Sequence, residues 1–134
     1  MSPASVARRT GAKDVFILRQ LEDGRLFNLD GFGRGAGWAG NISVAAAEEP
    51  MLHEALQGSL VRKRSGVPFR VFGPYWSSSV AIVPVDTGVV VFGEGSIATC
   101  GDQELNEAAV DARNAMHEIP AGKTEADALE LRGA

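Results

Sequence analysis

Apolar residues come along the chain in short blocks separated by turn residues, a pattern that favours β-strands. Val15–Leu18 is one such block, and Leu26–Leu29 is the next, after the turn Glu22-Asp23-Gly24-Arg25. An Asp-Gly pair between two apolar segments is a strong signal for a β-hairpin. Residues 15–21 and 26–29 are therefore predicted to form an antiparallel pair.

A second hairpin is predicted in the middle of the chain. Ser79–Val85 and Val89–Phe92 are rich in β-branched residues, and Asp86-Thr87-Gly88 joins them. Because Pro84 lacks an amide proton, we expect its strand to lie at an edge or to bend there. Shorter extended segments are predicted at residues 42–44, 60–62 and 69–72. Two hairpins among helices indicate an α+β fold.

Helices are predicted where end signals flank apolar positions. Residues 3–10 form a short helix that Gly11 ends. Glu48-Glu49-Pro50 is a favourable first turn for a helix that reaches Leu56 and stops at Gly58. Asp102 is a good cap for a longer helix that continues to Glu118.

The longer helix carries an apolar stripe with the alternating spacing of a coiled-coil seam. The stripe covers only about two heptads, fewer than a stable coiled coil needs. We expect it to be buried, either against its own sheet or against a partner subunit. Its members are Leu105, Ala109, Ala112, Met116 and Ile119.

Residues 31–40 contain five glycines, with Phe32, Arg34, Ala36 and Trp38 between them. Glycine at this density breaks both helices and strands. The segment is therefore predicted to be a mobile loop without a regular element.

Composition narrows the class of protein. The 134 residues are 45% hydrophobic and 22% charged, as expected for one globular domain. The net charge of -4 gives no general attraction to nucleic acid or to anionic membranes. A single cysteine, Cys100, allows no internal disulfide, and the apolar runs are too short to span a membrane. We expect a cytoplasmic protein.

Three segments, taken in order, resemble the GAF family of sensory domains. They are residues 7–33, 49–71 and 77–95. Gly66-Val67-Pro68 and Ser79–Val85 stand where that family has its G-x-P and S-x-x-x-x-P-V patterns. The resemblance covers residues 7–118 and rests on the order of several weak motifs.

The resemblance implies a central antiparallel sheet of about five to six strands with helices on one face. It also implies a loop-lidded pocket on the other face and, in many members, dimerisation through terminal helices. Residues 1–118 would form the domain, and residues 119–134 a tail with a short helix at 124–131. The first helix is shorter than usual in the family, because only ten residues precede Gly11.

Two functions from different classes follow from the resemblance. The first is a sensory or regulatory domain that binds a small molecule or a partner and signals through its terminal helices to an output domain. The second is a ligand-free module for dimerisation or interaction whose pocket is filled by its own side chains. A third and weaker reading is a haem-based gas or redox sensor that uses His53.

The pocket implied by the family lies between the loop at 31–41, the helix at 51–57 and the segment at 74–78. Aromatic groups beside hydroxyls suit a small-ligand pocket, and they suit the edge of a core equally well. The candidate ligand-binding residues are Trp38, Met51, His53, Tyr75, Trp76, Ser77 and Ser78.

Several known activities of the family lack their residues here. The Asn-Lys-Phe-Asp-Glu signature of cyclic-nucleotide binders is absent, and Cys100 is followed by Gly101 and not by the histidine typical of bilin carriers. Reduction of methionine sulfoxide needs more than one cysteine. The two histidines have no partners for a zinc site. No catalytic residue or metal ligand is predicted, and the ligand stays unknown.

The serines and the basic residues also have ordinary explanations. Ser77, Ser78 and Ser79 have no Gly-x-Ser-x-Gly context that would make one of them a nucleophile. Arg62–Arg64 and Arg70 form the basic cluster, with phenylalanines close by. In a chain of negative charge such a cluster is more typical of a solvated turn than of a nucleic-acid site.

Overall fold

The computed structural model describes residues 2–116 and contains a single six-stranded antiparallel sheet in the order β3-β2-β1-β6-β5-β4. The strands are β1 (Ala12–Gln20), β2 (Arg25–Phe32), β3 (Ser43–Ala45), β4 (Val61–Phe72), β5 (Tyr75–Val85) and β6 (Gly88–Gly95). The helices are α1 (Pro3–Thr10), α2 (Arg34–Gly37), α3 (Pro50–Leu56) and α4 (Asp102–Met116), with short 3-10 turns η1 (Ala46–Glu48) and η2 (Ile97–Thr99). The α+β class is confirmed.

Both predicted hairpins are present, and they meet at the centre of the sheet. β1 pairs with β2, β5 pairs with β6, and the pairing of β1 with β6 joins the two hairpins. Pro84 lies beyond Ile82, the last residue of β5 that pairs with β4. One side of its backbone is therefore a sheet edge, which is where a residue without an N–H group is tolerated.

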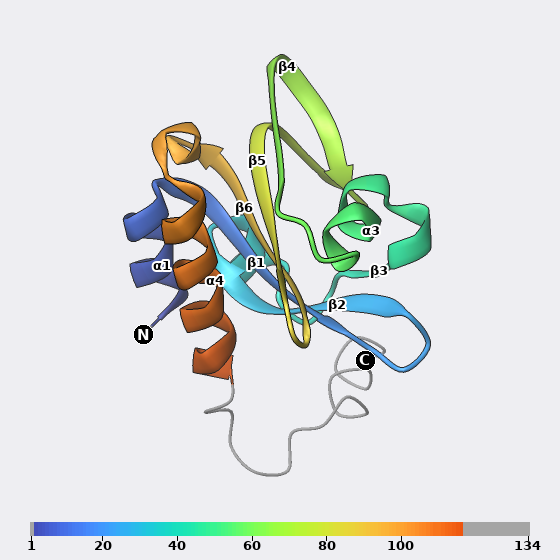
Figure 1. Ribbon diagram of the computed structural model, residues 1–134. Helices are drawn as coiled ribbons and strands as arrows, with labels where there is room; N and C mark the ends of the chain where they lie inside the picture. The colour runs from blue at the N-terminus through green and yellow to red at the C-terminus, as the bar shows by residue number, and fades with distance from the viewer. Residues whose placement is uncertain (1, 117–134) are drawn as a thin grey trace.

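Helices cover both faces of the sheet, whereas the family resemblance implied helices on one face only. In Figure 1, α1 and α4 lie side by side on one side of the sheet and α3 lies on the other. The physical reason is in the central strands. Val15–Leu18 and Val89–Phe92 are apolar without alternation and buried, so each face of the sheet needs its own cover.

The α4 stripe packs against the chain's own sheet. Leu105, Ala109 and Ala112 are fully buried in one cluster with Val90 and Phe92. Their prediction as buried positions is confirmed, and the alanines bring the helix close to the strands. The side chain of Met116, together with Ile119 and the helix expected at 124–131, lies outside the described residues. No helix in residues 2–116 is long and apolar enough to cross a membrane.

β4 is one bent strand where two short extended segments were predicted. Its pairing with β5 is regular from Val61 to Arg64 and resumes at Phe69 with a shifted register. Residues 65–68 are thus an outward excursion, and β4 rises farther than any other element in the view of Figure 1. The excursion lies opposite an irregular stretch of β5 at residues 77–79, where the alternation of side chains between the two faces is interrupted.

Candidate functional site

Four aromatic rings from four different segments meet on the α3 side of the sheet. Phe16 comes from β1, Trp38 from the end of α2, Phe72 from β4 and Tyr75 from β5. The ring centroids of Phe16 and Tyr75 are 4.6 Å apart, those of Phe16 and Phe72 5.1 Å, and those of Trp38 and Tyr75 6.2 Å. These spacings are those of packed aromatic pairs, and we call the group the aromatic cluster.

The segment Gly33–Trp38, which we call the lid, packs against β1 and β2 and brings the Trp38 ring into the cluster. The prediction that residues 31–40 contain no regular element is wrong, because β2 continues to Phe32 and α2 occupies Arg34–Gly37. Gly31 and Gly35 lie against the backbone of Val15, where an added Cβ would be 1.9 and 1.6 Å from its carbonyl oxygen. Gly35 thus permits close packing of the lid on β1, and Gly31 permits the close approach of β2 to the same strand.

Two buried polar side chains hold the lid. Asp14 Oδ1 accepts a hydrogen bond from the Arg34 N–H at 3.0 Å, and Asn28 Nδ2 donates to the Gly35 carbonyl at 2.9 Å. Asp14 stands at the start of the apolar run of β1, and Asn28 lies in the middle of β2. Sequence reasoning missed both, although a polar residue inside an apolar strand is a detectable signal.

Asp14 also binds Tyr75 below the lid. The Tyr75 hydroxyl donates to Asp14 Oδ2 at 2.9 Å, and both residues are buried. Burial is the main cause that raises the pKa of Tyr75 above its ordinary value, and the charge of Asp14 adds to it. The phenol therefore stays protonated and serves as a hydrogen-bond donor.

Asn28 keeps one polar atom without a partner. Its Oδ1 is buried and accepts no hydrogen bond from the residues that the structure describes. Asn28 lies opposite Leu18 across the β1–β2 ladder, so both side chains share the face that carries the aromatic cluster. A buried acceptor of this kind can accept a hydrogen bond from a donor group of another molecule.

Ser77 and Ser78 support the irregular stretch of β5. Ser77 Oγ donates to the Ser79 carbonyl at 2.6 Å and accepts from the Ser79 N–H at 3.2 Å. The Ser78 N–H donates to Glu94 Oε1 at 2.9 Å, and this bond is the main cause that lowers the pKa of Glu94. Glu94 has a φ of 59°, a left-handed conformation that costs energy in a residue with a side chain. The sequence carried no clear signal for Glu94.

The structure brings together only part of the predicted pocket. Trp38 and Tyr75 belong to the aromatic cluster, while Met51 packs at the border of the same core from α3. His53 is exposed on α3, a position that gives the haem reading no support. Trp76 is 53% exposed and points away from Tyr75, on the outer side of β5.

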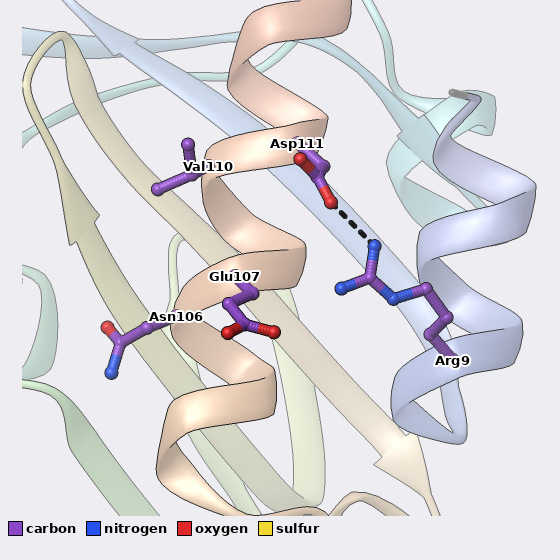
Figure 2. Close-up of a pocket in the computed structure, with 5 residues that line it drawn as sticks. All are labelled: Arg9, Asn106, Glu107, Val110 and Asp111. Atoms are coloured by element: carbon purple, nitrogen blue, oxygen red, sulfur yellow. Dashed lines mark hydrogen bonds and ion pairs between the residues drawn. The ribbon is translucent and has the colours of Figure 1, made fainter.

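A shallow hollow lies on the other side of the molecule, between the terminal helices. Figure 2 shows its lining residues, with Arg9 reaching from α1 toward Asp111 on α4. The Arg9 guanidinium binds Glu104 at 2.8 Å and Asp111 at 2.6 Å, so one cation joins α1 to two turns of α4. Within residues 2–116 no group of three or more histidine, cysteine or acidic residues is placed to hold a metal ion.

Comparison of the chain with protein-family models, with curated proteins and with solved structures finds no match.

Proposed function

We propose that this chain is a GAF-like regulatory module that acts by binding a partner protein and not by catalysis. The observation that carries the proposal is the aromatic cluster. Phe16, Trp38, Phe72 and Tyr75 occupy the space where the family resemblance implied a ligand pocket. A core filled by its own rings leaves the surface as the place where this module makes its contacts.

The contacts of the polar side chains support a non-catalytic role. A serine nucleophile needs a base within hydrogen-bond reach, whereas Ser77 Oγ is engaged by the backbone of Ser79 on both its donor and its acceptor side. The raised pKa of Tyr75 keeps it from acting as a base near neutral pH. Asp14, its partner, is occupied by the lid and by Tyr75.

One short stretch of chain links the lid to the terminal helices. Asp14 holds the lid from β1, and β1 begins directly after Gly11, which caps α1 with a φ of 78°. Arg9 of α1 in turn binds two carboxylates of α4. We expect a change in the packing of the lid to reach the terminal helices through this stretch, as a regulatory module requires.

Hydrogen exchange of the purified protein tests whether the core is closed. If the aromatic cluster is the resting core, the amides of Arg34, Gly37 and Trp38 should exchange slowly, close to the rate of the amides in β1. Native mass spectrometry should show the polypeptide without an added small molecule. Fast exchange of the lid together with a co-purified compound would overturn the proposal.

A small-molecule sensor is the second candidate, and the unpartnered Oδ1 of Asn28 favours it. A ligand with an N–H or O–H group that binds this oxygen should raise the melting temperature by mass action. The response should disappear in Asn28→Leu. It should persist in Asn41→Leu, the same change at an exposed residue between α2 and β3. Equal responses in both variants would place the ligand elsewhere.

A further inference from the structure

β4 is an edge strand of the sheet, and its outer side has no strand neighbour among the described residues. Its first part, residues 61–64, pairs regularly with Ile82–Ser79 of β5 on the inner side. In an antiparallel ladder every second residue directs its N–H and C=O groups away from its partner. A row of backbone donors and acceptors is therefore presented at this edge.

Cationic side chains flank the edge on both faces of the sheet. Arg62 lies opposite Ala81, which faces the α1–α4 side, and Arg64 follows on the same face two residues later. Lys63 points to the other face, where its Nζ lies 4.5 Å from the centre of the Phe69 ring. All three residues are exposed, in a chain whose net charge is -4.

The three cations differ in how far they are already neutralised. Arg62 Nε binds Asp102 at 2.7 Å, and its guanidinium also donates to the carbonyls of Ile97 and Cys100. Lys63 has the Phe69 ring as its contact. Arg64 has no ion pair with any residue that the structure describes. The charge of Arg64 is thus the one most available to another molecule.

Exposed apolar side chains are found in the same hairpin. Val67, in the excursion of β4, is 66% exposed, and Trp76 of β5 is 53% exposed. Trp76 lies opposite Arg70, whose guanidinium is held by Glu49 at 3.0 Å. Both residues belong to the hairpin that carries the open edge, and tryptophan is among the residue types enriched where proteins bind one another.

We infer that the outer edge of β4 at residues 61–64 binds an acidic, extended segment of a partner protein, which adds to the sheet as a further strand. Main-chain hydrogen bonds supply the pairing, while carboxylates of the partner face Arg64 and Lys63 across the new ladder. An apolar residue of the partner covers Val67. The inference rests on the proposed function in that it names the kind of partner that the module binds.

The backbone edge favours a peptide over a nucleic acid. Only another extended polypeptide can pair with a row of N–H and C=O groups along a strand. Moreover, Asp102 and Glu49 already neutralise Arg62 and Arg70, which reduces the charge available to phosphates. Two remaining cations, Lys63 and Arg64, suit the carboxylates of one short strand.

An amide-detected NMR titration tests the inference with a short synthetic peptide in which two adjacent glutamates stand among valines, because neighbouring residues of a strand point to opposite faces and can reach both Arg64 and Lys63. Peptide binding should shift the amides of residues 61–64 most strongly. Arg64→Glu should weaken it by about tenfold, since an attraction across the ladder becomes a repulsion. Arg8→Glu, the same charge change at an exposed position of α1, should leave the affinity unchanged.

Three further results would overturn the inference. One is equal binding of the same peptide with methylated backbone nitrogens on its pairing side, because such a peptide cannot form the ladder. Another is a thymidine oligonucleotide that shifts the same amides more strongly than the peptide does. The third is peptide binding that shifts the amides of α1 and α4 instead. That result would overturn the inference but not the proposed function. The proposed function is tested separately by hydrogen exchange of the lid.

Discussion

The hydroxyl of Tyr75 donates to Asp14 Oδ2 at 2.9 Å and so joins β5 to β1 across the intervening strand β6. The bond passes over Gly93, where an added Cβ would be 1.8 Å from the Tyr75 hydroxyl oxygen. Because Asp14 also holds the Arg34 N–H, one buried carboxylate connects the aromatic cluster to the lid. The lid and the bent hairpin therefore depend on each other for their positions.

Removal of the Tyr75 hydroxyl should destabilise the fold. Tyr75→Phe keeps the ring but leaves a buried carboxylate oxygen of Asp14 without its donor, which costs about 1–3 kcal/mol. Urea unfolding followed by circular dichroism measures the change. Trp76→Phe, at the exposed neighbour, should change stability by less than about 0.5 kcal/mol. Equal effects of the two substitutions would show that the hydrogen bond between Tyr75 and Asp14 does not contribute to stability.

A methyl group at Gly35 should displace the lid. Its Cβ would lie 1.6 Å from the Val15 carbonyl oxygen, and a backbone atom cannot move aside as a flexible side chain can. We expect Gly35→Ala to cost about 1–3 kcal/mol and to shift tryptophan emission to the red as Trp38 becomes more exposed.

Gly37 is the matched control within the same helix. An added Cβ there meets nothing within 4 Å, and alanine is a better helix former than glycine. Gly37→Ala should therefore be neutral or stabilise by up to about 1 kcal/mol. A loss of stability as large as that of Gly35→Ala would contradict the close packing of the lid.

Because of Glu94, the free energy of unfolding should depend on pH in the acid range. The Ser78 N–H lowers its pKa below the ordinary value of 4.5, so folding favours the ionised carboxylate. Its stabilisation is complete above about pH 4.5 and is lost as the pH falls through the lowered pKa of the folded state. The difference in unfolding free energy between the native protein and Glu94→Gln should shrink over that interval. A difference that stays constant from neutral pH to about pH 3 would contradict this assignment.

Leu105 should act within one chain and not as part of a dimer seam. It is completely buried in the cluster under α4, so Leu105→Ala should cost about 2–5 kcal/mol. The loss should be the same at low and at high protein concentration, because no subunit contact is removed. Val110→Ala, at a residue of α4 that is 48% exposed, is the control with a small effect. A loss of stability that depends on protein concentration would show that Leu105 contributes to a dimer interface.

Local elements were largely predictable from the sequence. The Asp-Gly turn between two apolar runs indicated the β1–β2 hairpin, and Gly11 and Pro50 marked a helix end and a helix start. Each of these signals acts within a few residues, because a turn or a cap depends on backbone conformations and hydrogen bonds of neighbouring positions. The α+β class followed from their order.

The site depended on contacts that no local signal describes. Asp14 and Tyr75 are 61 positions apart, and the glycines read as breakers of structure serve as contact points for Val15. Which side chains face the core was also decided at a distance. Tyr75 and Val80 point into the same cluster although strict alternation would place them on opposite faces.

Tyr75 and Val80 can share one face because the register shifts between Arg64 and Phe69 and the Ser77–Ser79 hydrogen bonds hold an irregular stretch of β5. The same shift turns Trp76 outward. The sequence by itself determined which segments are strands and helices, because those preferences are local. Only the tertiary structure decided which of two adjacent aromatic residues became core and which became surface. A strand exchanges its two faces with a shift of a single residue, and that shift is set by the strand beside it.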